Sequence, residues 1–196
     1  MKNRKRNRKI GYDYSQNNLY FVTCCVNNME CCFGDVIRVG TGRDLSLNNA
    51  EINNSKMNNP ERNEAEMILN EYGIIANNQL EWLQIQYPYI ELHSYQVMPN
   101  HIHAVIEINS LKVNSIDKTG NEQSVLGSVK IKSLSQIMGA YKTTSSKKIH
   151  LLGNDQFIWQ RSFYDHIIRD ERSYQNIMNY IENNPNCWNK DKFYKN

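Results

Sequence analysis

Residues 99–108 have the sequence PNHIHAVIEI, in which the turn-forming pair Pro99-Asn100 leads directly into a predicted β-strand. Because side chains alternate between the two faces of a strand, one face here is aliphatic and carries Ile102, Ala104, Ile106 and Ile108. The other face begins with His101 and His103, about 7 Å apart at a rise of roughly 3.4 Å per residue. Two imidazoles at this separation could bind one cation; the alternative is an ordinary half-buried strand with two surface histidines.

The segments before this strand predict two further strands and one helix. Tyr89–Met98 predicts a strand that pairs with the histidine strand as an antiparallel hairpin, because only Pro99-Asn100 separates the two. Residues from about 61 to 86 predict a packing helix that starts at Pro60 and is weakened in its middle by Gly73. Leu19–Val26 is rich in β-branched and aromatic residues and predicts a buried first strand.

The segments after it predict two further helices and one strand. A helix begins at Ser133, an aromatic strand covers Phe157–Ile168, and a last helix opens at Arg169-Asp170-Glu171. The order of elements is therefore β-α-β-β-α-β-α. This order predicts an α+β fold of the ferredoxin-like split βαβ type, an antiparallel sheet with helices over one face, plus an additional C-terminal helix.

The composition is typical of one globular domain. The chain has 196 residues, of which 40% are apolar, and we expect a single domain over 1–196 with polar surface insertions at about 36–63 and 109–132. No stretch approaches the roughly 20 apolar residues needed to span a bilayer, and no apolar region follows the basic start. We therefore expect a cytoplasmic protein without a membrane partner.

Positive charge is concentrated at the N-terminus, although the formal net charge is only +3. The arm over residues 1–11 includes Arg4, Lys5 and Arg6 and contains no acidic residue. Such a run suits a polyanion, and it equally suits a solvated, disordered terminus. Lys142, near the end of the helix that begins at Ser133, could likewise stabilise the helix dipole or contact phosphate.

The five cysteines do not have the spacing of a zinc site or of a disulfide framework. We expect reduced, small hydrophobic side chains. A metal site at Cys24, Cys25, Cys31 and Cys32 is the alternative, but adjacent cysteines on a strand point to opposite faces.

The last helix carries a tyrosine outside its apolar stripe. The stripe follows helical spacing and consists of Tyr174, Ile177, Met178 and Ile181. Tyr180 lies roughly 110° from the centre of this stripe, and Asn184 projects from the same side four residues later. Pro185 ends the helix there. Tyr180 and Asn184 could act as a pair, or Tyr180 could simply pack at the edge of the apolar face.

Four motifs, in this order along the chain, together resemble the single-tyrosine HUH transposases of insertion sequences, and within them the REP-associated tyrosine transposases. The motifs are Tyr12-Asp13-Tyr14 with Tyr20-Phe21-Val22-Thr23, Met98-Pro99-Asn100-His101-Ile102-His103, the segment from Trp159 to Arg169, and Tyr180-Ile181-Glu182-Asn183-Asn184-Pro185. They span nearly the whole chain apart from the two insertions.

The resemblance implies the roles of three kinds of residue. His101 and His103 would bind a divalent ion, Mg²⁺ or Mn²⁺, and Tyr180 would be the nucleophile. Asn184 stands where relatives carry a third metal ligand, although relatives of the simplest insertion-sequence type have Gln there and Asn is one methylene shorter. Three other tyrosines are rival nucleophiles: Tyr141, Tyr164 and Tyr174.

The function implied is that of a metal-dependent single-strand DNA transesterase, a transposase that cleaves and rejoins hairpin-forming repeat DNA through a 5′-phosphotyrosine intermediate. The partner would be single-stranded or hairpin DNA, bound by a monomer or homodimer that associates with the nucleoid. Candidate phosphate contacts are Arg4, Lys5, Arg6, Lys142 and Arg161. A catalytically silent hairpin-binding regulator and a metal-dependent nuclease that uses water are the alternatives.

Overall fold

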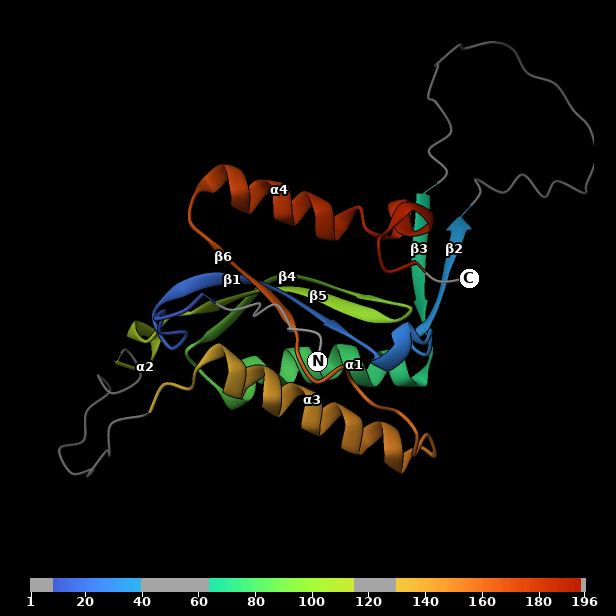
Figure 1. Cartoon of the computed structure of the whole chain (residues 1–196), viewed down its shortest axis with the longest axis horizontal. Helices are drawn as coiled ribbons and strands as arrows, with labels where there is room; N and C mark the ends of the chain where they lie inside the picture. Colours follow the sequence, from blue (N-terminus) through green and yellow to red (C-terminus); the bar gives the residue numbers. More distant parts are fainter. Residues whose placement is uncertain (1–8, 40–63, 115–129, 195–196) are drawn as a thin grey trace, which may run out of the picture.

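The computed structural model describes residues 9–39, 64–114 and 130–194, and its centre is a four-stranded antiparallel sheet in the order β4-β5-β1-β6 (Figure 1). The strands are β1 (Asn18–Cys25), β4 (Ile90–Met98), β5 (His101–Ile108) and β6 (Tyr164–Ile168). The crossover helices are α1 (Glu71–Gln86) and α3 (Leu134–Leu151). This topology confirms the predicted α+β fold with a split βαβ arrangement.

The sheet has helices on both faces. Figure 1 shows α1 and α3 together below the sheet and α4 (Glu171–Glu182) above it. The aliphatic face of β5, with Ile102 and Ile106, belongs to the large core. Val105, on the opposite face, packs instead with Ile168 and with Ile181 of α4. The predicted alternation along β5 is therefore confirmed, and the histidine face is the one that α4 covers.

The predicted helix over residues 61–86 is wrong in its first part. Residues 64–69 form strand β3 (Glu64–Leu69), which pairs with β2 (Gly34–Val39), and α1 begins only after Asn70, whose side chain accepts from two backbone N–H groups of its first turn. The predicted helix start at Pro60 lies outside the described residues. Glu, Ala, Met and Leu favour helices, but pairing with β2 overrides that local preference. The insertion was predicted to begin at about residue 36, but residues 36–39 belong to β2.

Two glycines allow close backbone approaches, one between β2 and β3 and one between α1 and the residue before β2. A Cβ atom at Gly34 would lie 2.0 Å from the carbonyl oxygen of Ile68, and Gly34 has a φ of +127°. A Cβ atom at Gly73 would lie 2.1 Å from the carbonyl oxygen of Phe33. Gly73 is therefore not a weak point in the middle of a helix. It lies in the first turn of α1, where the backbone of residue 33 leaves no room for a side chain.

The strand predicted over Phe157–Ile168 is present only as β6. Trp159 forms an isolated bridge with Val26, and the chain between this bridge and β6 is not a strand. The Lys142 ammonium donates to the carbonyl oxygens of Gln160 (2.8 Å) and Ser162 (3.0 Å), so these backbone acceptors are satisfied by a side chain. Aromatic content alone did not predict this interruption.

The remaining elements are short: η1 (Asn27–Met29), α2 (Leu111–Asn114) and η3 (Pro185–Lys190). Residues 109–114 and 130–132 of the second insertion are described, whereas the basic residues Arg4, Lys5 and Arg6 lie outside the described residues. All five cysteines are free thiols. In the part of the chain that the structure describes, no helix has the length and the apolar content to cross a bilayer.

Candidate active site

The start of β5 places two histidines side by side beneath α4. His101 and His103 are 0% and 1% exposed, and their Nε2 atoms are 3.0 Å apart. The alternative of two surface histidines is therefore wrong. Two nitrogens about 3.0 Å apart are also what two bonds of roughly 2.1 Å to one ion, meeting at a right angle, would give.

The partners of Asn100 determine which nitrogen of His101 is free. The Asn100 amide nitrogen donates to the carbonyl oxygens of Met29 (3.2 Å) and Phe193 (2.8 Å), so its oxygen must face His101. That oxygen lies 2.9 Å from Nδ1 of His101, and this Nδ1 must be the donor. The Nε2 atom of neutral His101 therefore carries a lone pair directed at His103.

Thr23 of β1 can accommodate either protonation form of His103. Its hydroxyl is 2.8 Å from Nδ1 of His103 and can donate or accept. When Thr23 donates, Nε2 of His103 carries a proton and can donate to His101. When Thr23 accepts from Nδ1, both Nε2 lone pairs face one another and suit a shared cation.

Burial keeps both imidazoles uncharged. It lowers the pKa of His101 to about 4, against a smaller opposing effect of Asp191. Burial, and next the charge of His101, also lower the pKa of His103 well below its ordinary value. Neutral imidazoles are the form that binds metal ions. The pair is thus suited to a cation at neutral pH without competition from protons.

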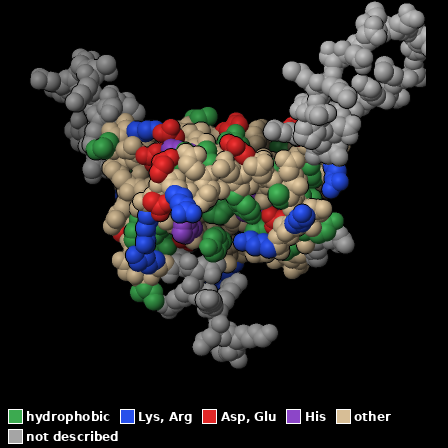
Figure 2. Space-filling model, turned by 90° about the horizontal axis from the view of Figure 1, so that it is seen from above, with side chains coloured by type: hydrophobic (Ala, Val, Ile, Leu, Met, Phe, Trp, Pro, Cys, Tyr) green, Lys and Arg blue, Asp and Glu red, His purple; other side chains and the backbone are tan. Residues whose placement is uncertain are grey.

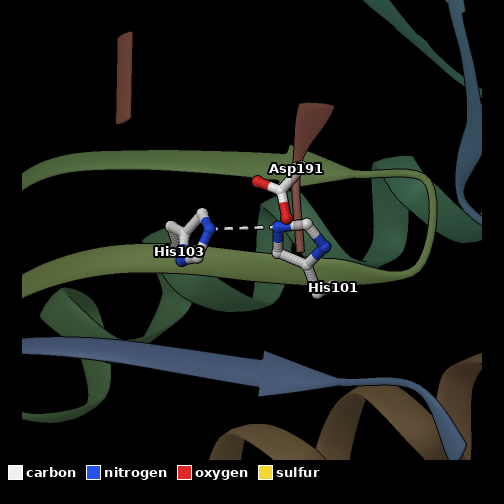
Figure 3. Close-up of side chains that lie close together, drawn as sticks. All are labelled: His101, His103 and Asp191. Carbon is white, nitrogen blue, oxygen red and sulfur yellow. Dashed lines mark hydrogen bonds between the residues drawn. The ribbon is translucent and has the colours of Figure 1, made fainter. Parts of the chain in front are cut away.

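A carboxylate completes a group of possible metal ligands. Asp191, which follows η3, lies with His101 and His103 so that one ligand atom from each falls within 4.8 Å of the others (Figure 3). The Asp191 carboxylate accepts from the Asn184 amide nitrogen at 2.9 Å. Asn184 is 1% exposed, and its amide oxygen has no hydrogen-bond partner among the described residues. Two buried imidazoles, a carboxylate and an unpaired amide oxygen fit a divalent cation.

Tyr180 is the tyrosine that the fold brings to the histidines. Its hydroxyl is 3.2 Å from Nε2 of His103 and 3.3 Å from a carboxylate oxygen of Asp191, and the residue is 39% exposed. Burial, and next the charge of Asp191, raise its pKa to about 12. Without a cation nearby, this phenol is protonated at neutral pH.

An open cleft of about 650 Å³ leads to Tyr180 between α4 and β6. Its wall includes the exposed ring of Tyr164 and several charged or titratable side chains: the cations Arg172, Lys190 and Lys192, the imidazole of His166, and the carboxylates of Asp170 and Asp191. Figure 2 views the molecule from the α4 side and shows Lys and Arg side chains beside a histidine and several hydrophobic side chains. The cleft therefore combines positive charge with an aromatic surface.

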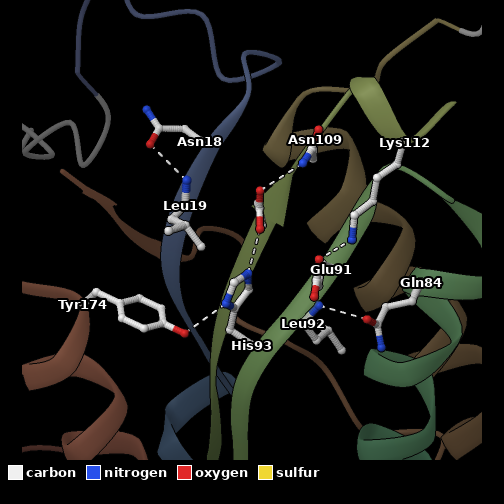
Figure 4. A network of polar contacts seen from close by, with 10 residues as sticks. Asn18, Leu19, Gln84, Glu91, Leu92, His93, Asn109, Lys112 and Tyr174 are labelled. Carbon is white, nitrogen blue, oxygen red and sulfur yellow. Dashed lines mark hydrogen bonds and ion pairs between the residues drawn. The ribbon is translucent and has the colours of Figure 1, made fainter. Parts of the chain in front are cut away.

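The rival tyrosines lie in other surroundings. Tyr141 is completely buried and donates to the carbonyl oxygen of Ala76. The Tyr174 hydroxyl is 2.9 Å from Nδ1 of His93, within a second group of possible ligands formed by Glu91, His93 and Glu107 (Figure 4). There the histidine contacts Glu107 and Glu91 pairs with Lys112. Tyr164 lines the same cleft as Tyr180, so exposure alone does not separate these two.

Of the predicted DNA contacts, the two that lie in the described residues are not at this cleft. Lys142 and Arg161 line a different groove, along α3. The Lys142 ammonium donates to two backbone carbonyl oxygens and lies 5.6 Å from the centre of the Phe163 ring. These contacts within the protein account for its position without a contact to DNA. A phosphate contact by Lys142 or Arg161 stays a prediction.

No family model matches the chain, but the chain is similar to several known proteins. An uncharacterised protein of Haemophilus influenzae is 27% identical over 194 residues, which cover 93% of this chain and 88% of that protein. The structure of a REP-associated tyrosine transposase bound to a REP hairpin shares 15% identity at a TM-score of 0.49, over 93% of this chain and 73% of that one. A candidate transposase of Deinococcus radiodurans shares 14% identity at a TM-score of 0.42, over 91% and 97%. These values are too low to assign an activity.

Sequence reasoning missed three residues of the site: Thr23, Asn100 as the partner of His101, and Asp191. Thr23 and Asn100 belong to the motifs that carried the family resemblance, and the register Thr23↔His103 follows once β1 and β5 are paired. Neither a motif nor a strand register indicated Asp191, because this residue follows an irregular segment after Pro185.

Proposed function

We propose that this protein is a metal-dependent single-strand DNA transesterase of the HUH tyrosine type, with His101 and His103 as metal ligands and Tyr180 as the nucleophile. The observation that carries the proposal is the contact between the Tyr180 hydroxyl and the buried histidine pair, at 3.2 Å from Nε2 of His103. A nucleophile and a cation-binding pair on opposing elements are what transfer to a phosphodiester requires.

The reaction would exchange one phosphodiester for another. The Tyr180 oxygen attacks the phosphorus atom, the bond to the 3′ oxygen breaks, and the products are a 5′-phosphotyrosine and a free 3′-OH. The phenol loses one proton and the 3′ oxygen gains one, so no water is consumed and the step is reversible. A divalent ion bound by His101 and His103 would supply positive charge to a non-bridging phosphate oxygen and to the phenolate.

The chain's own residues would position the strand. The cleft beside Tyr180 is open and bears Arg172, Lys190 and Lys192, which suit a phosphodiester backbone. The exposed ring of Tyr164 suits the face of an unpaired base, because base stacking on aromatic side chains does not depend on sequence. Single-stranded DNA, including single-stranded ends beside a hairpin, is therefore the proposed substrate.

The test is covalent capture. The protein with Mn²⁺ is incubated with a library of labelled hairpin oligonucleotides that have random single-stranded flanks, and the adduct is sought on denaturing gels. We expect an adduct with the wild type and none with Tyr180→Phe, which removes one oxygen and keeps the ring. Tyr164→Phe is the matched control, since it makes the same change in the same cleft and should still form the adduct.

Each other result contradicts the proposal. Cleavage without an adduct, retained by Tyr180→Phe, would show a nuclease that uses water. Binding of the hairpins without cleavage or adduct would show a DNA-binding regulator. An adduct that maps to Tyr164 would leave the reaction class intact but remove Tyr180 as the nucleophile.

A further inference from the structure

The resemblance to the HUH transposases implies a metal ligand on α4, at Asn184, and the side chains bring a carboxylate, that of Asp191, to the same histidines. The amide nitrogen of Asn184, and not its oxygen, contacts Asp191 at 2.9 Å. An amide binds a cation through oxygen, since its nitrogen has no available lone pair. The reversed amide would instead bring two oxygens together at 2.9 Å, with no hydrogen between them.

Asp191 is held in a fixed orientation by three donors. One carboxylate oxygen accepts from the amide of Asn184 and the hydroxyl of Tyr180, and the other accepts from the backbone N–H of Phe193 at 2.7 Å. Phe193 in turn packs on His101, with ring centroids 4.7 Å apart. The carboxylate is thus fixed beside the two histidines, and Figure 3 shows all three side chains converging.

Charge favours the same conclusion. Imidazole binds a metal ion in its neutral form, so two imidazoles and an amide would offer a divalent cation no negative charge. Lys192, which follows Asp191 directly, also adds positive charge to the same cleft. A carboxylate is the ligand that Mg²⁺ and Mn²⁺ prefer, and Asp191 is the acidic residue grouped with the pair.

We infer that Asp191 is a metal ligand of the proposed site, and that the amide nitrogen of Asn184 holds the Asp191 carboxylate against the histidines. This inference rests on the proposed function, because it uses the same cation. It goes beyond that function in adding a ligand from the segment after η3 to those that the resemblance implies.

The test measures cation binding without DNA. Mn²⁺ affinity is determined by electron paramagnetic resonance of the free ion, and Co²⁺ is used as a spectroscopic probe of coordination. We expect Asp191→Asn, which keeps shape and removes charge, to weaken Mn²⁺ binding more than about 100-fold. Asp155→Asn, an exposed residue in another groove, removes the same charge and should change affinity less than about twofold.

A second variant distinguishes the loss of a metal ligand from misfolding of the protein. Asp191→Glu keeps the carboxylate on a longer side chain, so it should bind Mn²⁺ and shift the visible absorption of bound Co²⁺, which a merely structural role of Asp191 would leave unchanged. Thermal unfolding without metal checks that each variant is folded.

The outcomes separate this inference from the proposed function. If His101→Ala and His103→Ala bind Mn²⁺ as tightly as the wild type, the proposed metal site itself is wrong. If those two variants lose binding while Asp191→Asn keeps it, only the role of Asp191 is wrong.

Discussion

Acid should destabilise the metal-free protein, and His101 should account for a large part of the loss. Burial lowers the pKa of His101 from 6.5 to about 4. Below pH 6.5 the unfolded chain takes up a proton at this residue that the folded protein does not. The stability contributed by the neutral ring is therefore complete above pH 6.5 and is lost as the pH falls toward 4.

The magnitude follows from that difference in pKa. At pH 5, the unfolded chain gains about RT ln(1 + 10^1.5) from protonation of this residue and the folded protein about RT ln(1 + 10^−1), a difference of about 2 kcal/mol. Burial lowers the pKa of His103 in the same direction, so its contribution has the same sign. A typical domain has only about 5–15 kcal/mol of stability, which makes the effect readily measurable.

The assay is urea unfolding in EDTA at pH 7 and pH 5, followed by fluorescence of the three tryptophans. We expect His101→Gln to reduce the acid-induced loss in the free energy of unfolding by about 2 kcal/mol relative to the wild type. His166→Gln removes an exposed histidine and leaves the buried pair in place, so it should keep the full loss. Equal losses in His101→Gln and the wild type would refute the reasoning from burial.

Two further predictions concern the partners of the site and of α1. Thr23→Val keeps a β-branched side chain in β1 but leaves Nδ1 of His103 without an acceptor. The affinity for Mn²⁺ should therefore fall about 10-fold to 100-fold, while the thermal stability of the metal-free protein changes much less. An unchanged Mn²⁺ affinity would show that Thr23 is not part of the site. Gly73→Ala should lower the free energy of unfolding by about 1–3 kcal/mol because its Cβ atom would meet the Phe33 carbonyl oxygen, although alanine normally favours a helix. Gly139→Ala in α3, where no atom lies within 4 Å of the added Cβ, is the matched control and should stabilise the protein by up to about 1 kcal/mol in urea unfolding.

The central sheet could be predicted because its strands have local signals. β5 alternates aliphatic and polar positions, and its connection to β4 is too short for anything but a hairpin. The error at β3 came from the same local reasoning. Residues Glu64–Leu69 alternate between exposed and half-buried side chains, as a strand requires, yet they consist of residues that favour helices. Only the pairing with β2, which lies beyond residues 40–63 in the chain, decides between the two.

The candidate site was predictable to the extent that its residues lie in short motifs. His101 and His103 lie two residues apart on one strand, and their shared face follows from the geometry of any strand. Asp191 reaches them from a segment 88 residues beyond His103, after an irregular turn, and neither spacing nor periodicity relates such positions. Its recognition needed the packing of Phe193 on His101 and the hydrogen bond from Asn100 to the Phe193 carbonyl oxygen.

The position of Asp191 links cation binding to the state of the proposed nucleophile. Burial is the largest cause of the raised pKa of Tyr180, and the charge of Asp191 is the next, so in the absence of a cation this carboxylate helps to keep the phenol protonated. A ligand carboxylate shares its charge with the bound ion, and its unfavourable effect on the phenolate is then offset. Under the proposed assignment, the residue that binds the cation is therefore also one that holds Tyr180 inactive without it. Asp191→Asn should accordingly weaken Mn²⁺ binding and also lower the pKa of Tyr180 in the metal-free protein, which is measured from the phenolate absorbance. If the pKa of Tyr180 does not fall, Asp191 does not link cation binding to the protonation of the nucleophile.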